Sequence, residues 1–451
     1  MKEEHERLKG AAEWATPPLS PARAARAAAV AREVAERVRT PERVMAATAA
    51  AAGQTAFPLT ARWVPWSLAQ GDAGLALMCG YADSCFPDDG WDIAAHRYLH
   101  TAATAVQEVA WPPAALFEGL SGLAFAAESL SRGNTRYQRL IHVIDAAVLP
   151  RTVQLAVELS TQQGGLPVGV FDLISGLTGI GARLLARRED GAAADGLHAV
   201  LTGLVSMARE VDGLPRWHTP SHLMGDETMA RQYPHGVLNC GLAHGVPGPM
   251  ALMALALEEG VEIPGLSETV WHLAQWLVAH RLETATGVSW PTMIPLTSEG
   301  KLEEPPTSHT AWCYGTPGVA RSLWLAGRAL GQPSLCDLAI DGMAEVYRRD
   351  TPERGIDSPT FCHGVAGLLQ VTLRFAHDTG RPEFTRWANT LTDQILDRYE
   401  PDSLLGYRDL EPGSRKIDHA GLLIGSPGVV LALLAASTGV RPDWDRLFLL
   451  A

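Results

Sequence analysis

A short glycine motif recurs seven times along the chain and limits the possible folds more than any other feature. Each copy has two glycines separated by two residues, followed by an apolar run. The copies are GDAG at Gly71, GLSG at Gly119, GLTG at Gly176, GVPG at Gly245, GTPG at Gly315, GVAG at Gly364 and GSPG at Gly425. Successive first glycines are 48, 57, 69, 70, 49 and 61 residues apart. Seven copies in the same context predict a repeat protein in which each motif begins a helix.

Two kinds of helix are predicted in each repeat. The runs after the motifs are small and apolar, as in VVLALLAASTG after Gly428, which predicts helices buried on nearly all sides. Helices with one polar face are predicted between them, for example over residues 266–282 and 383–400. Seven such pairs can stack as an open solenoid or close into a ring. Open solenoids need polar capping repeats, and the seventh motif is wholly apolar, so we expect an all-α fold that closes into an α/α toroid.

The regions outside this repeat pattern suggest a domain organisation. Residues 1–60 are predicted to form an N-terminal helical extension packed on the toroid, with a helix after Ser20-Pro21, and residues 61–451 to form the toroid itself. Two stretches rich in Pro, Thr and His, around residues 212–239 and 284–310, account for the two longest intervals. We expect them to form loops on one rim, where substrate contacts would lie.

Charge and cysteine usage exclude several classes of protein. The net charge of −13 argues against a nucleic-acid-binding protein, which normally carries a basic patch. The charged N-terminus lacks the apolar core of a secretory signal. Residues 420–440 are uncharged and long enough to span a bilayer, but GSPG interrupts them, so we interpret them as a buried helix and its entry. Six thinly spread cysteines do not resemble a disulfide scaffold. These features predict a cytoplasmic protein that is not an integral membrane protein.

Cysteines stand at matching positions in two neighbouring repeats. If the repeats are equivalent, the residues just before each first glycine share one location on the rim. Cys313 and Cys362 both lie two residues before that glycine, and His363 follows directly. Two thiolates and an imidazole suit zinc, and three protein ligands leave a fourth position open, as in catalytic zinc sites. The alternative is that both are ordinary buried thiols. The other cysteines, Cys79, Cys85, Cys240 and Cys336, are predicted to be inert.

Three further residues are candidates for chemistry at the same place. His244 has the position of His363 in the fourth repeat and could act as an acid or base near neutral pH. Asp172 lies four residues before Gly176. Tyr314 follows Cys313 and could donate a hydrogen bond to a substrate oxyanion. Each also has a structural interpretation, as a packed histidine, a capping carboxylate and a packing aromatic residue respectively.

The segments GLAHGVPG, AWCYGTPG and CHGVAG, in this order within a seven-repeat helical chain, resemble the lanthionine synthetase C-like family. The resemblance extends from about Gly71 to Gly428. It implies an α/α toroid with a central zinc ion held by Cys313, Cys362 and His363. It also implies that His244 and Asp172 are active-site residues and that Tyr314 lines the site.

One position departs from the family pattern. Such proteins usually carry an arginine three residues before the tryptophan of WCYG, and here His309 stands there. The departure leaves open whether this position stabilises an enolate or whether the substrate preference differs.

The resemblance implies a particular reaction and partner. The partner is a dehydrated precursor peptide with its leader, and a dehydratase and transporter complex stays open as a further partner. A peptide thiol loses its proton at zinc and adds to a dehydroalanine or dehydrobutyrine residue. His244 then transfers a proton and Asp172 assists. The product is a lanthionine or methyllanthionine thioether ring.

Other functions fit parts of the same pattern. A helical-toroid glycosidase needs two opposed carboxylates; Glu118 and Asp172 are available, but the Cys and His residues would be unexplained. A non-catalytic, zinc-bearing scaffold that binds a peptide or glutathione is a second alternative. The addition of glutathione to dehydro residues in proteins is a third.

Overall fold

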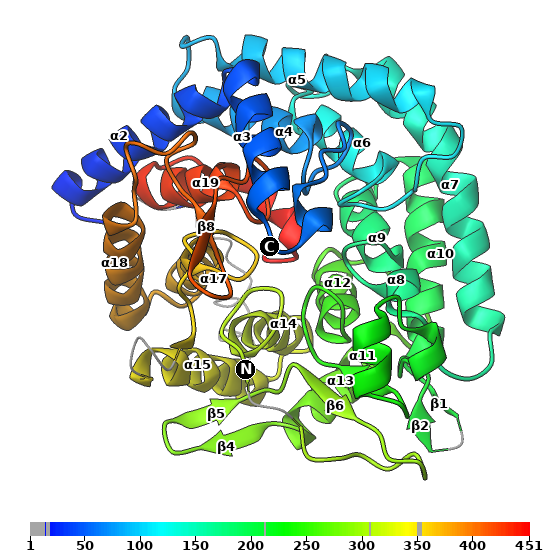
Figure 1. Ribbon diagram of the computed structural model, residues 1–451. Coiled ribbons are helices and arrows are strands. Elements are labelled where there is room, and N and C mark those ends of the chain that lie inside the picture. Colours follow the sequence, from blue (N-terminus) through cyan, green and yellow to red (C-terminus); the bar gives the residue numbers. More distant parts are fainter. Residues whose placement is uncertain (1–13, 15–18, 212, 306–307, 350–353) are drawn as a thin grey trace.

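The computed structural model describes residues 14, 19–211, 213–305, 308–349 and 354–451, and its helices form two concentric rings (Figure 1). In this part of the chain, seven helices form the inner ring, and each begins one or two residues after the first glycine of its motif. They are α4 (Asp72–Cys85), α6 (Leu120–Ser129), α9 (Leu177–Leu185), α12 (Pro247–Glu258), α14 (Thr316–Ala329), α17 (Val365–Thr379) and α19 (Ser426–Ser437).

The outer ring is built mainly from the helices between the motifs. Six of its described members follow their inner partners in the chain: α5 (Trp91–Ala105), α7 (Gln138–Thr161), α10 (Gly191–Met207), α13 (Leu266–Ala279), α15 (Pro333–Arg348) and α18 (Pro382–Asp397). The seventh comes from the other end of the chain, because α2 (Pro21–Val38) packs along α19. Since α19 also packs on α4, the inner ring closes, and the predicted all-α toroid is confirmed.

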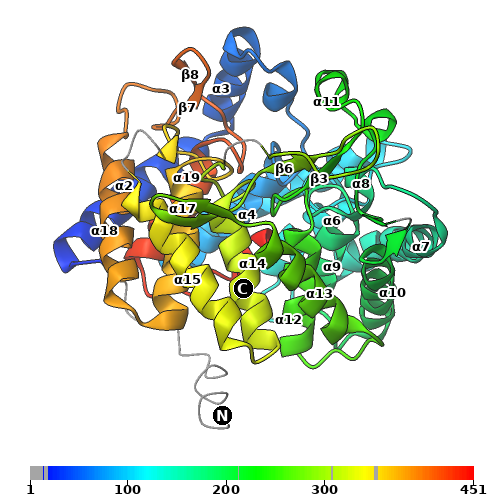
Figure 2. The same cartoon turned by 90° about the horizontal axis from the view of Figure 1, so that it is seen from below.

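The N-terminal helices have two different positions. Helix α2 belongs to the outer ring, whereas α3 (Pro41–Gln54) and the 3₁₀ helix η1 (Pro58–Ala61) cross one end of the toroid (Figures 1 and 2). The predicted domain boundary at residue 60 stays a prediction. Contacts between α2 and α19 nevertheless make the start of the described chain part of the ring.

The second glycine of each motif allows a loop to lie against the helix that follows it. A Cβ atom on Gly122 would lie 2.0 Å from the carbonyl oxygen of Leu116. In all seven motifs the nearest atom to such a Cβ is the carbonyl oxygen six residues earlier, at 2.0 to 2.6 Å. Any side chain would push the loop away, so the motif requires glycine for close backbone approach.

The seven loops before the motifs are joined by a closed circle of backbone hydrogen bonds. In the described chain, each link is one N–H group that donates to a carbonyl oxygen of the next loop. The links, donor first, are Leu68 to Phe117, Phe117 to Ile174, Leu173 to Ala243, Ala243 to Cys313, Cys313 to Cys362, Cys362 to Leu423 and Leu422 to Ala69. The N···O distances lie between 2.7 and 3.3 Å. The circle therefore holds equivalent residues of all seven repeats at one level. We call it the loop circle.

Short strands lie at the same end of the toroid as the loops. All four pairs in the described chain are antiparallel: β1 (Glu210–Val211) with β2 (Leu214–Pro215), β3 (Val237–Asn239) with β6 (Met293–Pro295), β4 (Leu282–Thr284) with β5 (Gly287–Ser289), and β7 (Asp409–Glu411) with β8 (Arg415–Ile417). The pairing of β3 with β6 joins the two stretches predicted to form rim loops. Helices α3 and α11 (Glu227–Gln232) and the β7–β8 hairpin project from the same end (Figure 2).

The chain's C-terminal segment packs into the centre of the ring. The 3₁₀ helix η4 (Asp443–Phe448) places the Phe448 ring 4.1 Å from that of Phe361 and 4.8 Å from that of Trp312, centroid to centroid. The indole N–H of Trp312 donates to the Phe448 carbonyl at 3.1 Å. Arg374 of α17 forms a buried ion pair with Asp445 at 2.6 Å. This segment therefore packs beneath the loop circle.

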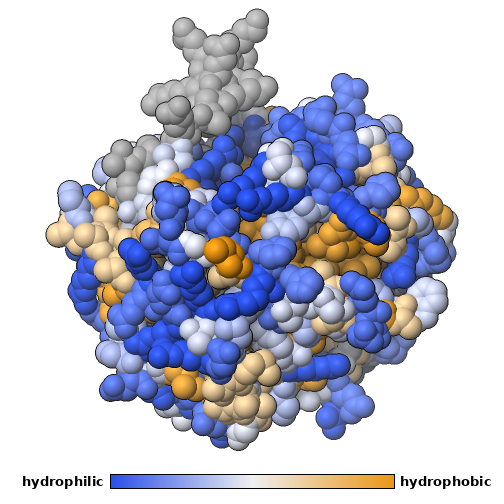
Figure 3. Space-filling model, turned by 90° about the horizontal axis from the view of Figure 1, so that it is seen from above, coloured by the Kyte–Doolittle hydropathy of each residue, from blue (hydrophilic) through white to orange (hydrophobic). Residues whose placement is uncertain are grey.

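Two segments of the chain are notably apolar. The uncharged stretch 420–440 contains α19, which is only 12 residues long and buried in the inner ring, as predicted. In the described chain, α7 alone has the length and composition to cross a membrane, with 33% of its most apolar window buried. It packs against α6 and α10. The side of the molecule that Figure 3 shows is mostly hydrophilic, with separate apolar patches.

We predict that Gly122→Ala destabilises the protein by about 2 kcal/mol, because the new methyl group overlaps the Leu116 carbonyl and the loop must shift. Gly191→Ala is the matched control, because a Cβ there meets nothing within 4 Å. Urea unfolding of both variants measures the change. Equal free energies of unfolding for the two variants would contradict the close-approach explanation.

Candidate active site

Next to the loop circle, one end of the toroid carries a set of mostly polar side chains, which we call the mouth. The residue three before each first glycine is fully buried, at 0% exposure in all seven repeats: Leu68, Leu116, Leu173, Leu242, Trp312, Phe361 and Leu422. The residue directly before each first glycine is at least partly exposed in six of the seven: Gln70, Glu118, Ser175, His244, Tyr314 and His363. Polar side chains from most of the repeats thus share this end of the toroid, next to a layer of buried apolar residues.

Cys313 and Cys362 lie side by side in this mouth. The Cys313 N–H donates to the Cys362 carbonyl at 3.3 Å as one link of the loop circle. A hydrogen bond with the Cys362 thiol lowers the pKa of Cys313, and the positive charges of His363 and His244 lower it further. The pKa of Cys362 is raised by the same hydrogen bond and by burial. Cys313 therefore loses its proton at a lower pH than Cys362 does.

The side chains at this place are of the kinds that bind zinc. Two adjacent thiols and a neighbouring imidazole are the ligand types that zinc prefers. In the described chain, however, no three His, Cys, Asp or Glu side chains already stand in a metal-binding arrangement. The Nε2 atom of His363 lies 3.5 Å from Oδ1 of Asp409. The predicted ligand roles of Cys313, Cys362 and His363 stay predictions.

His244 and Asp172 form a close pair on the adjacent part of the mouth. Nδ1 of His244 lies 2.6 Å from Oδ2 of Asp172. The other carboxylate oxygen accepts the N–H groups of Ser175 at 2.7 Å and Gly176 at 2.8 Å. Asp172 is 1% exposed, whereas the His244 side chain is 36% exposed. A buried, fully engaged carboxylate therefore orients an imidazole that solvent or a substrate can reach.

The Asp172 contact also sets the charge of His244. Burial by itself lowers the pKa of His244, but the hydrogen bond and negative charge of Asp172 raise it more, with smaller contributions from Cys313 and Glu118. The imidazole therefore holds a proton to a higher pH than a free histidine does. A group that gains and loses a proton in this range suits general acid–base chemistry.

Tyr314 follows Cys313 in the chain, and its ring lies near His244. Its ring centroid is 6.0 Å from that of His244, and its hydroxyl accepts a hydrogen bond from the Asn239 amide at 3.2 Å. Burial raises the pKa of Tyr314 to about 12. The hydroxyl proton is thus retained at neutral pH and stays available for donation.

The side chain of His309 is outside this network of contacts between described residues. Its carbonyl accepts the N–H of Thr316 at 3.2 Å, which connects the rim to the start of α14. Its residue is exposed, and the imidazole makes no hydrogen bond or ion pair to any residue the structure describes. The predicted role of His309 stays a prediction.

Two residues of the site escaped the sequence analysis. The amide of Asn239 donates to the Tyr314 hydroxyl and accepts the N–H of Gly241, the latter at 3.0 Å. Asn239 lies six residues before Gly245, so its position relative to the repeat motif could have pointed to it. Asp409 comes from the β7–β8 hairpin, and no repeat signal marks it. Burial raises the pKa of Asp409, but the contact with His363 and the Ser358 hydroxyl lower it more.

The chain belongs to the lanthionine synthetase C-like family, whose model matches residues 62–449. The predicted family and enzyme class are therefore confirmed. One relative, the nisin biosynthesis protein NisC of Lactococcus lactis subsp. lactis, is 25% identical over 299 residues, which cover 65% of this chain and 70% of the relative. A solved structure of a nisin cyclase superposes with a TM-score of 0.73 at 22% identity, covering 86% of this chain and 93% of that one. The latter likeness shows the shared toroid fold.

We predict that Asp172→Asn lowers the pKa of His244, as measured by NMR titration of its imidazole. The folded-state pKa lies above the ordinary value of 6.5, so the charged pair contributes stability fully below that pH. This contribution is lost as the pH rises through the raised pKa. The difference in unfolding free energy between wild type and variant should therefore shrink above that pH. A difference independent of pH would contradict the assigned pairing.

Proposed function

We propose that this protein is a zinc-dependent lanthipeptide cyclase that closes thioether rings in a dehydrated precursor peptide. The observation that carries the proposal is the backbone hydrogen bond between Cys313 and Cys362, which brings two distant thiols together beside the His244–Asp172 pair. Family membership supports the lanthionine-forming activity. The name of the relative NisC points to a peptide substrate of the same general kind.

Cys313, Cys362 and His363 would hold the zinc ion. The bound zinc would lower the pKa of a peptide cysteine thiol so that its thiolate can add to a dehydro residue. The residues themselves support this assignment: the pKa of Cys313 is already lowered, and three ligands leave room for a substrate sulfur.

His244 would move the proton that the reaction requires. Addition of a thiolate to the β-carbon leaves negative charge on the substrate carbonyl and an α-carbon that must gain a proton. His244 is exposed enough to reach the substrate and is held by Asp172 in one orientation. We assign it the proton transfer to the α-carbon. The Tyr314 hydroxyl lies close by and would donate a hydrogen bond to the carbonyl oxygen.

The glycosidase alternative fits the structure poorly. It would require Asp172 as one of two opposed carboxylates. Asp172 is 1% exposed, and its oxygens already accept from two backbone N–H groups and contact His244, so the carboxylate is not accessible to a sugar or a catalytic water. The other alternative, a zinc-bearing scaffold without catalysis, is distinguished from a cyclase by measuring cyclisation of a dehydrated peptide.

The proposed substrate also suggests the surroundings in which the enzyme works. We infer that it acts on a leader-bearing precursor peptide, after a dehydratase and before export by a transporter. That place in the sequence of reactions implies a cytoplasmic enzyme. Such a peptide would contact the mouth. The β3–β6 pair, α11 and the β7–β8 hairpin lie at the same end of the toroid (Figure 2).

We expect metal analysis of the purified protein to find about one zinc per chain. Cys362→Ala should lose it, because the site would then keep a single thiolate. Cys336→Ala is the matched control, since Cys336 is a buried thiol on α15 with a pKa raised by burial to about 12. A wild-type chain free of metal after growth in zinc would contradict the zinc assignment.

We expect His244→Ala to slow ring closure by about 10²-fold or more while zinc stays bound. The assay follows the loss of free thiol in a dehydrated, cysteine-containing peptide, because cyclisation consumes thiol without changing the mass. His198→Ala on the outer helix α10 serves as control. Persistent peptide thiol with zinc-loaded wild-type protein would favour the non-catalytic scaffold.

A further inference from the structure

The β7–β8 hairpin places a buried carboxylate beside the candidate zinc ligand His363. Asp409, the first residue of β7, is 4% exposed. Its Oδ1 atom lies 3.5 Å from Nε2 of His363. A charged carboxylate in such a place is costly unless other groups compensate for its lost hydration, so its partners indicate what it is there to do.

Two hydroxyl groups and one imidazole converge on the same oxygen of Asp409. The Ser358 hydroxyl donates at 2.6 Å and the Thr360 hydroxyl at 3.4 Å. Both belong to the loop that carries Cys362 and His363. These hydroxyls hold the carboxylate against the loop and leave it facing the ring nitrogen of His363.

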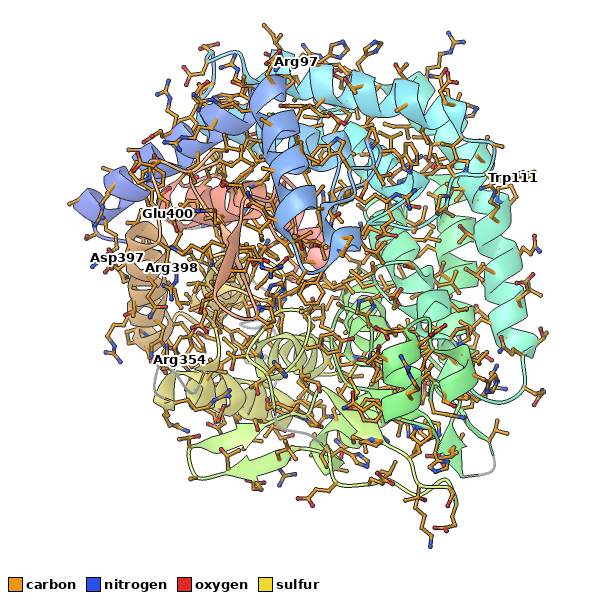
Figure 4. The ribbon with its side chains drawn as sticks, viewed as in Figure 1. Arg97, Trp111, Arg354, Asp397, Arg398 and Glu400 are labelled. Atoms are coloured by element: carbon orange, nitrogen blue, oxygen red, sulfur yellow. The ribbon has the colours of Figure 1, made fainter. Side chains whose placement is uncertain are left out.

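The hairpin itself is fixed from two sides. Glu411, on the same strand and 6% exposed, accepts the N–H of Ala56 at 2.9 Å and binds the Thr55 hydroxyl. On the other strand, Lys416 donates to Glu400 at 2.7 Å, and Figure 4 shows Glu400 beside the hairpin. The carboxylate of Asp409 is therefore held in a defined position rather than on a free loop.

We propose that Asp409 is the positioning residue for the zinc ligand His363: its carboxylate accepts the Nε2–H group, which fixes the ring tautomer and leaves Nδ1 to face the metal. This inference rests on the proposed zinc site. Histidines that bind metals commonly donate their second N–H to a carboxylate, and loss of that partner typically weakens metal binding by about 10- to 100-fold. The two hydroxyls are then the means by which Asp409 itself is held.

The test compares zinc affinities, measured by competition with a chelator, for wild type, Asp409→Asn and the control Glu345→Gln. The asparagine variant keeps an oxygen that can accept from Ser358 but removes the charge. We expect it to bind zinc about 10- to 100-fold more weakly. The glutamine variant changes a buried carboxylate on α15 whose hydrogen bonds and ion pair go to Thr284, Thr286 and Arg349. Because these contacts involve neither His363 nor the β7–β8 hairpin, we expect its affinity to equal that of wild type.

Ser358→Ala separates positioning of the imidazole from anchoring of the loop. It removes a hydrogen bond to Asp409 but keeps the carboxylate beside His363, so it should weaken zinc binding less than Asp409→Asn does. Equal losses in the two variants, or an unchanged affinity in Asp409→Asn, would overturn the proposal. A wild-type chain without zinc affinity would instead remove the proposed zinc site, and this inference with it.

A measurement on wild-type protein covers the case in which Asp409→Asn does not fold. A crystal structure of the zinc-loaded chain should show Nδ1 of His363 on the metal and Nε2 within hydrogen-bonding distance of Asp409. Zinc bound through Nε2 would overturn the assignment.

Discussion

The closed circle of backbone hydrogen bonds between the seven loops is the constraint on which the rest of the structure depends. The loops lie at one end of the ring, but most of their linked residues are buried, and an unpaired backbone N–H or carbonyl group that is buried costs about 1–3 kcal/mol. Each loop satisfies its groups by bonding to the next, and the last bonds to the first through Leu422 and Ala69. The glycine pairs let each loop sit against its helix, so the repeat motif is a packing requirement of the circle.

The side-chain pairs of the candidate site lie next to links of this circle. The link from Leu173 to Ala243 lies beside the Asp172–His244 pair, because each of these residues is a chain neighbour of one linked residue. The link from Cys313 to Cys362 joins the two thiols across 49 residues of sequence. A distant set of residues therefore gains the rigid placement that acid–base and metal chemistry require.

The β7–β8 hairpin contributes something that the repeats do not. Its two carboxylates contact different parts of the chain: Asp409 lies beside His363 of the sixth repeat, and Glu411 accepts the N–H of Ala56. The hairpin thus connects the candidate metal ligand with the segment between α3 and η1. Irregular segments on a repeated scaffold are where individual chains can adjust a shared site.

The sequence by itself determined the repeat, the closed all-α ring and the set of residues at equivalent positions. These features follow from local rules, because glycine spacing and apolar periodicity depend only on residues that are close together in the sequence. The register alone put Cys313, Cys362, His363 and His244 at one level. Only the tertiary structure decided that α2 completes the outer ring and that Asn239 holds Tyr314. It also decided that Asp409 lies beside His363 while the His309 imidazole bonds to no described residue. Such contacts join segments whose order in space depends on ring closure and on hairpins outside the repeat, and no local spacing encodes them.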